Sequence, residues 1–404
     1  MTKTRKLLLS AVLLIILPSL LFAVDFGLIV DQSAGFGGIV GNDTQTDYTA
    51  LFIPRFSTLI GDNGSFLISA GLAAVYEYEE FRFVPELLRT EFHWIFRTSD
   101  LRIGRMHYSD PLGFIAEGLF DGAQFTVDTA AGSFSAGAWY TGFLYKKRAN
   151  IAMNEAEVQS LGTMLDYDNF VDTYFAPRRA LVALDWVHPG LADGVLRTRL
   201  SVLCQFDLTD EDVNSQYITA QLSFPVRAFT LSFGGSLGLL QDSGDQRVSY
   251  ALEFGTTWAL PTIFPSRLSL LGRYASGRSD DGTTIMEFRP VTLRSQSPVL
   301  QPKIPGLSMI LLDYSARFNR EFGMSLSSFY FIRNDLHTYV GYPVGADDDG
   351  HFLGNEFFAR LFWRPASDVY FNLGGGLFMP SLGNAAPRLD NAWRVELGLT
   401  ISLF

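Results

Sequence analysis

The chain has 404 residues, a formal net charge of −11, a hydrophobic content of 48% and a mean hydropathy of +0.15. An acidic balance of this size argues against a nucleic-acid-binding protein. The single cysteine, Cys204, excludes an internal disulfide, and we interpret it as a small apolar side chain.

The chain opens with a basic segment followed by an apolar one. Lys3, Arg5 and Lys6 precede an apolar run that extends from Leu7 to Phe22. This order is typical of a secretory signal peptide, so we expect residues 1–23 to be the signal and residues 24–404 to form a single exported domain. A membrane anchor is the alternative, and Pro18 and the modest length of the run argue against it.

After Ala23 no stretch approaches the ~20 consecutive apolar residues that a membrane-spanning helix requires. A chain this apolar must therefore distribute its hydrophobicity in another way. Because every backbone polar group needs an internal partner in lipid, the spanning structure that remains is a closed β-barrel.

Apolar and polar residues alternate with a period of two in several segments, most clearly at the C-terminus. Trp393, Val395, Leu397, Leu399, Ile401 and Leu403 alternate with Arg394, Glu396, Gly398, Thr400 and Ser402. Residues 195–206 and 249–258 show the same period, which indicates strands with one lipid-facing side. The final Phe404 falls on the opposite parity from the apolar stripe of its own segment.

Short and long connections alternate along the chain. The short ones are at 61–64, 98–100, 129–132, 189–194, 225–228, 261–266, 319–322 and 365–368. The longer, more polar ones are at 31–47, 76–80, 107–118, 146–177, 207–213, 240–246, 276–305, 333–354 and 379–391, and a helix is expected at 154–165. This asymmetry predicts an all-β, transmembrane, antiparallel up-and-down barrel of about 18 strands, with 16 as the alternative, whose short turns are periplasmic and whose long loops are extracellular.

Charged side chains occupy the parity opposite to the apolar stripe. A charge facing lipid costs ~2–4 kcal/mol at the midplane, so these side chains are expected to face the lumen. The predicted pore-lining residues are Arg89, Glu91, Arg197, Arg199, Arg273, Asp313, Arg317, Glu356, Arg360, Arg394 and Glu396. A basic lumen favours anions, and the alternative is that Arg–Glu pairs brace the wall without selecting a solute.

No residue pattern indicates an enzyme, a cofactor or a metal site. The five histidines, His93, His107, His188, His337 and His351, show no metal-ligand spacing. His107 lies two residues before Ser109, but no further catalytic motif accompanies them, and we expect no catalytic activity.

Two stretches resemble the alginate-export family of outer-membrane porins. In residues 101–128 the resemblance lies in Gly104-Arg105 and in Asp121-Gly122, and in residues 355–404 it lies in Phe371–Gly376, Leu377–Pro380 and the closing strand. It implies a monomeric eighteen-stranded barrel whose basic lumen passes an anionic polysaccharide or small solutes. Met106 stands where the family usually has glutamine.

These observations predict an outer-membrane channel for the diffusive passage of hydrophilic, anionic solutes. Its expected partners are outer-membrane lipid, the solute and the barrel-assembly machinery, and a monomer is favoured over a trimer. The alternative is a non-conducting surface barrel whose long loops bind host or neighbouring molecules.

Overall fold

The structure is a computed structural model that describes residues 24–42, 44–77, 79–209, 213–242, 245–279, 285–338, 342–344 and 349–404. The predicted signal peptide, residues 1–23, lies outside the described residues. In the part of the chain that is described, no helix is long and apolar enough to cross a membrane.

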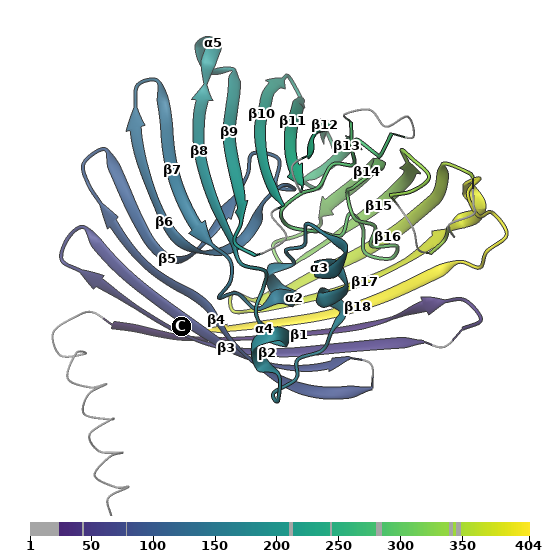
Figure 1. Cartoon of the computed structure of the whole chain (residues 1–404), viewed down its shortest axis with the longest axis horizontal. Coiled ribbons are helices and arrows are strands. Elements are labelled where there is room, and N and C mark those ends of the chain that lie inside the picture. The colour runs from purple at the N-terminus through teal and green to yellow at the C-terminus, as the bar shows by residue number, and fades with distance from the viewer. Residues whose placement is uncertain are drawn as a thin grey trace, which may run out of the picture.

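Over the described residues the chain forms one closed antiparallel sheet of eighteen strands (Figure 1). Each strand pairs with its neighbours in sequence, and β1 pairs with β18 from Leu28↔Leu403 to Ile39↔Ala392, which closes the barrel. The first nine strands are β1 (Val24–Ile39), β2 (Gln45–Ile60), β3 (Gly64–Glu77), β4 (Glu80–Ile95), β5 (Ser99–Ser109), β6 (Glu117–Thr129), β7 (Gly132–Tyr140), β8 (Arg179–Gly190) and β9 (Leu196–Asp207). The remaining nine are β10 (Asn214–Val226), β11 (Phe229–Asp242), β12 (Asp245–Leu260), β13 (Ser266–Ala275), β14 (Leu307–Arg317), β15 (Phe322–Arg333), β16 (Phe352–Ala366), β17 (Val369–Met379) and β18 (Ala392–Leu403).

The short helices lie in the connections between strands. They are α2 (Lys146–Ala149), α3 (Glu155–Gly162), α4 (Phe170–Tyr174), α5 (Leu191–Gly194) and the 3-10 helix η1 (Pro380–Leu382). The helix expected at 154–165 is confirmed as α3, which begins where the Asn154 side chain accepts a hydrogen bond from the Glu157 backbone N–H at 2.8 Å.

The eight short connections coincide with the predicted turns, so the strand number of eighteen is confirmed. Three of the connections predicted to be long are wrong. The first is shorter than predicted, because β1 continues to Ile39 and β2 already begins at Gln45. The second and sixth are shorter too, because β3 continues to Glu77 with β4 beginning at Glu80, and β11 continues to Asp242 with β12 beginning at Asp245. Polar residues such as Asp31, Ser33 and Asp47 were assigned to a loop, yet a barrel strand accepts them on its water-facing side.

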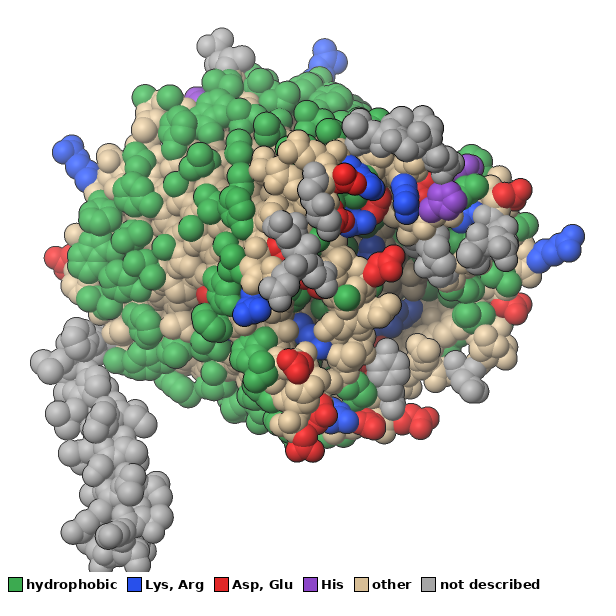
Figure 2. Space-filling view, in the orientation of Figure 1, with side chains coloured by type: hydrophobic (Ala, Val, Ile, Leu, Met, Phe, Trp, Pro, Cys, Tyr) green, Lys and Arg blue, Asp and Glu red, His purple; other side chains and the backbone are tan. Residues whose placement is uncertain are grey.

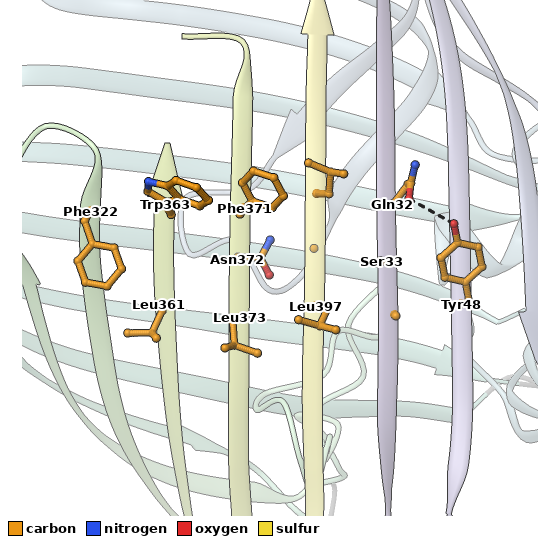
Figure 3. Close-up of a pocket in the computed structure, with 13 residues that line it drawn as sticks. Gln32, Ser33, Tyr48, Phe322, Leu361, Trp363, Phe371, Asn372, Leu373 and Leu397 are labelled. Carbon is orange, nitrogen blue, oxygen red and sulfur yellow. Dashed lines mark hydrogen bonds between the residues drawn. The ribbon is translucent and has the colours of Figure 1, made fainter. Parts of the chain in front are cut away.

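The outer wall of the barrel is apolar. Exposed large side chains occupy alternate positions of the strands, for example Leu237 in β11, Leu312 in β14 and Phe357 in β16, and Figure 2 shows such side chains covering the wall. On the β15–β2 side these side chains leave a shallow outer groove, lined by Leu361, Phe371 and Leu397 among others (Figure 3).

The outer groove contains one polar pair. The Tyr48 hydroxyl donates to Gln32 Oε1 at 3.4 Å, so two polar side chains on the lipid-facing parity meet each other. A wall this apolar is suited to lipid, where a buried or lipid-exposed polar group needs such a partner.

The wall is interrupted between β4 and β5. These strands pair only from Thr90↔Arg105 to Ile95↔Asp100 in the described chain, although β4 starts at Glu80 and β5 continues to Ser109. The carbonyl oxygens along this free edge of β4 are satisfied by side chains instead of a neighbouring strand.

The connection between β7 and β8 supplies most of the groups that close this interruption. The Tyr174 hydroxyl donates to the Pro85 carbonyl at 2.6 Å, the Tyr167 hydroxyl donates to the Phe83 carbonyl, and Arg82 donates back to the Leu165 carbonyl at 2.8 Å. Residues 165–174 of this connection are therefore a part of the barrel wall.

The two dipeptides that carry the family resemblance are register partners on β5 and β6, where Gly104 pairs with Gly122 and Arg105 pairs with Asp121. Arg105 binds Asp121 with two hydrogen bonds, from Nε at 2.8 Å and from Nη2 at 2.7 Å, and it also donates to the Leu87 carbonyl at the free edge of β4. The pair lies on the outward parity with Ile103, so it braces the rim of the interruption and does not face the lumen.

Gly104 has a backbone that another residue would adopt only with strain. Its φ is +119°, and a Cβ atom there would lie 1.9 Å from the Thr90 carbonyl oxygen of the neighbouring strand. We expect Gly104→Ala to lower the free energy of unfolding by about 2 kcal/mol or more, since such a φ alone costs ~1–3 kcal/mol. Urea unfolding of the barrel in lipid vesicles measures this.

Gly272→Ala is the matched control, because a Cβ atom at this glycine of β13 meets nothing within 4 Å. Its free energy of unfolding should stay within about 0.5 kcal/mol of that of the original chain. Equal stability of the two variants would contradict the role given to the β4–β5 junction.

Candidate functional site in the lumen

The predicted pore-lining residues all lie on the inner parity of their strands. In β14, for example, Ile310 and Leu312 face outward, so Asp313 and Arg317 point inward. In β16, Phe357 and Leu361 face outward, so Glu356 and Arg360 point inward. Their contact with a conducted solute stays a prediction.

Three connections fold into the barrel and pack on its inner wall with their described residues. They are the β5–β6 loop (110–116), the β7–β8 loop (141–178) and the β13–β14 loop (276–306). Their apolar side chains, including Leu112, Ile151 and Phe288, form one buried cluster with wall residues of β5 to β13. The narrowing of the lumen is thus built from long-range contacts between loops.

The β5–β6 loop is held in shape by one carboxylate. Asp110 accepts hydrogen bonds from the backbone N–H groups of Leu112, Gly113, Ile115 and Ala116 at 2.8–3.1 Å. Burial raises the pKa of Asp110, and the four donors oppose that shift. Four backbone donors on one side chain make this loop a rigid element of the lumen.

The tip of the β5–β6 loop contacts two predicted pore arginines. The Arg273 guanidinium lies 4.6 Å from the centre of the Phe114 ring, and Arg199 donates to the Pro111 carbonyl at 3.2 Å. Arg273 also donates from Nε to Glu253 at 3.0 Å. The loop tip therefore extends from β5 to contact the inner side of β9 and of β13.

Glu356 anchors the β13–β14 loop. It is fully buried and accepts hydrogen bonds from the Ser297 hydroxyl at 2.6 Å, the Val299 N–H at 3.0 Å and the Leu300 N–H at 2.9 Å. Although Glu356 was predicted to line the pore, it lies beneath this loop, out of reach of a solute. Sequence period alone could not reveal that a loop covers it.

Part of the lumen is left open and is lined by charged side chains. A cavity of about 920 Å³ lies between the β7–β8 loop and the inner wall of β2 to β4 and β18. Its lining includes Asp47, Glu86, Arg148 and Arg394. A second cavity of about 710 Å³ lies among the loops, and both share Gln301.

The wall of the larger cavity carries a chain of ion pairs. Arg394 donates from Nε to Glu396 at 2.9 Å and from Nη2 to Asp47 at 3.1 Å, and Arg360 donates to Glu396 at 3.2 Å. The predicted residues Arg360, Arg394 and Glu396 are therefore brought together. Asp47 completes the chain and was missed because it was assigned to a loop.

The smaller cavity is partly apolar and is bordered by Lys303. Burial lowers the pKa of Lys303, and its ammonium group donates to the Ser295 hydroxyl at 3.0 Å. Arg278 and Arg289 line the same cavity, so its cations outnumber Glu155 and Glu287 by one.

Within the described ranges, no group of three or more histidine, cysteine, aspartate or glutamate residues is arranged to hold a metal ion. The lumen thus combines cavities lined by charged side chains with loops that pack on its wall. A closed membrane barrel with such an interior has the architecture of a porin.

The comparisons with known proteins agree with this class. No family model and no curated protein sequence matches the chain. Three solved structures from Pseudomonas aeruginosa match its fold. OccK2 (OpdF) has a TM-score of 0.63 and 13% identity, and the match covers 94% of this chain and 97% of that chain. OccK5 (OpdH) has a TM-score of 0.62 and 13% identity, with coverage of 94% of this chain and 98% of that chain. OprD has a TM-score of 0.60 and 12% identity, with coverage of 94% of this chain and 95% of that chain.

Identity this low shows a shared fold. The fold is that of the OprD and Occ outer-membrane channels, and the specific resemblance to alginate-export porins receives no support from the comparisons.

We expect Glu356→Ala to release the β13–β14 loop, since three hydrogen bonds to one buried carboxylate are lost. Limited proteolysis of the barrel in vesicles should then cut residues 285–306 at least ten times faster. Glu396→Ala is the control, because its partners Arg360 and Arg394 belong to the wall. Equal cutting of both variants would show that Glu356 does not hold the loop.

Proposed function

We propose that the chain is an outer-membrane channel for the diffusive passage of hydrophilic solutes, with a preference for anions. The observation that carries this proposal is the charged cavity of about 920 Å³ inside a closed barrel with an apolar outer wall. A solute that crosses it exchanges water for arginine and carboxylate groups, which suits polar molecules.

The preference for anions is supported by the way the inner arginines are paired. Several inner arginines have acidic partners: Arg89 with Glu91, Arg102 with Asp100, Arg273 with Glu253, and Arg394 with Asp47. Nearer the short turns, six inner arginines lack a carboxylate within ion-pair distance among the described residues: Arg55, Arg197, Arg199, Arg267, Arg317 and Arg364. Pairs brace the wall, whereas unpaired cations leave net positive charge for a solute.

OccK2 has been solved in complex with glucuronate, a sugar that carries a carboxylate. We propose the same broad class, hydrophilic organic anions, for this chain. The alginate-export resemblance would extend the class to an anionic polysaccharide.

Residues 1–23 are proposed to direct export and to be removed, and the assembled barrel is proposed to lie in the outer membrane with its short turns in the periplasm. Its assembly would use the barrel-assembly machinery, and its surroundings would be outer-membrane lipid. A monomer is favoured because the chain closes its own sheet and fills its own wall interruption.

The second candidate, a non-conducting surface barrel with binding loops, rests on the length of the β7–β8 and β13–β14 connections. Deleting residues 276–305 separates the two, because the conductance of a channel should persist or rise while that of a scaffold stays zero. Deleting 146–177 is less suitable, because Tyr167 and Tyr174 of that loop close the wall.

Planar-bilayer recording tests the channel. We expect stepwise conductance and a reversal potential in a salt gradient that shows a preference for anions. Arg394→Gln should shift the preference towards cations, because it leaves Asp47 and Glu396 with less positive charge. Ser328→Ala on β15 is a neutral control.

Absence of conductance would overturn the channel, and a cation preference of the original chain would overturn the anion selectivity. An unchanged reversal potential in Arg394→Gln would show that the ion-paired wall only braces the barrel.

A further inference from the structure

Four arginines gather at the short-turn mouth of the barrel, on the side formed by β13 to β17. They are Arg267 at the start of β13, Arg317 at the end of β14, Arg320 in the β14–β15 turn and Arg364 near the end of β16, and we call them the turn-mouth arginines. All four line one cavity of about 620 Å³. Three adjacent turns therefore bring four cations to one place.

The inward direction of these side chains follows from the strand parity. Leu270, Leu312 and Leu361 face outward, so Arg267, Arg317 and Arg364 lie on the inner face of their strands. The arginines therefore line the cavity from the water-facing side, whereas the outer groove of Figure 3, which shares Phe322 with this cavity, lies on the outward parity.

Each of three turn-mouth arginines has one positioning contact. Arg267 Nε donates to the Ser315 hydroxyl at 2.9 Å, Arg317 Nη2 donates to the Arg320 carbonyl at 3.0 Å, and the Arg364 guanidinium lies 5.7 Å from the centre of the Tyr370 ring. A guanidinium has five N–H donors, so one such contact leaves most of them available.

The turn-mouth arginines differ from several other inner arginines in their charge balance. In the described part of the chain none of the four forms an ion pair, whereas Arg273, Arg360 and Arg394 each do. Glu321 is the one carboxylate in the cavity lining, and it forms no ion pair with these arginines. Four like charges this close are unfavourable without counter-charges, and within the cavity lining the protein supplies one, Glu321.

We propose that the turn-mouth arginines form a binding site for a small polyvalent anion, one that carries two or more carboxylate or phosphoryl groups. Such groups accept paired hydrogen bonds from guanidinium, and several of them are needed to neutralise four cations and one carboxylate. The Phe362 and Tyr370 rings also line the cavity and give its wall an apolar part.

The site deepens the proposed function, since it rests on the lumen being an aqueous path that opens at this mouth. It places the strongest attraction for an anion at the short-turn end of that path, away from the loops that narrow the lumen. An anion that crosses the barrel is then concentrated at one end, and exchange with bulk water there controls its release.

Equilibrium dialysis of the refolded full barrel in detergent tests the site without requiring conduction. The probes are citrate and inorganic pyrophosphate, with acetate as the monovalent comparison, at low ionic strength. We expect both polyvalent anions to bind at least tenfold more tightly than acetate. The triple variant Arg267→Gln/Arg317→Gln/Arg364→Gln should lose at least tenfold in affinity for them.

Arg227→Gln is the matched control, because Arg227 is an exposed arginine in the β10–β11 turn and does not line the cavity. It should bind both anions as the original chain does. Retention of heat-modifiable migration in gels shows that each variant is folded. Equal affinity of the original chain and the triple variant, or no preference for polyvalent anions, would overturn the site.

The two proposals fail separately. A barrel that binds citrate or pyrophosphate through these arginines but does not conduct retains the site and loses the channel. A barrel that conducts and binds neither anion retains the channel and loses the site.

Discussion

The satisfaction of backbone hydrogen bonds in lipid is the constraint on which the rest of the structure depends. A strand edge inside a bilayer has no water to bond, so the sheet must close on itself. The pairing of β1 with β18 does this over most of both strands. Where β4 and β5 separate, the protein still meets the constraint with side chains, as Tyr174 and Arg105 bond the carbonyls that a strand would otherwise bond.

Closure also separates two environments by side-chain parity. The outward side chains are apolar, and the inward ones carry the charges. Inside, the chain divides the lumen again. Three loops pack with the apolar residues of β5 to β13, while charged residues such as Arg394 and Asp47 line a cavity that the loops leave open.

The distribution of charge follows from the same architecture. Arg273, Arg360 and Arg394 are matched by acidic partners, and these ion pairs brace the wall. At the short-turn mouth of β13 to β17, arginines such as Arg317 stand without ion-pair partners in the described chain, which gives this mouth a local excess of positive charge.

The sequence predicts the wall well because a strand between lipid and water must alternate. The period of two in residues 393–403 placed Arg394 and Glu396 on the inner face, and six of the eight short turns contain Gly or Pro. Polar strands are harder to recognise, which is why Asp47 was assigned to a loop. Phe404, predicted to lie off the apolar stripe, packs beside Gly27 and under Arg55, at 6.0 Å, on the inner parity.

The interior could not be predicted from the sequence, because it depends on contacts between segments far apart in the chain. Arg273 meets Phe114, and Glu356 holds Ser297, across separations that no local period encodes. Glu356 was therefore placed on the correct face, and the loop that buries it was missed. The sequence also did not predict that Arg105 and Asp121 form an outward-facing ion pair, because this pair lies at the interruption between β4 and β5.

The most direct test of the account is whether the two parities of one strand face different solvents. Single cysteines are introduced into a Cys204→Ser background on β18, as Glu396→Cys, Thr400→Cys and Ser402→Cys on the inner face and as Leu397→Cys, Leu399→Cys and Ile401→Cys on the outer face. With the barrel in lipid vesicles, a membrane-impermeant maleimide should label the inner set and leave the outer set unlabelled. Equal labelling of both sets, or labelling of the outer set alone, would contradict a closed barrel with a water-filled lumen.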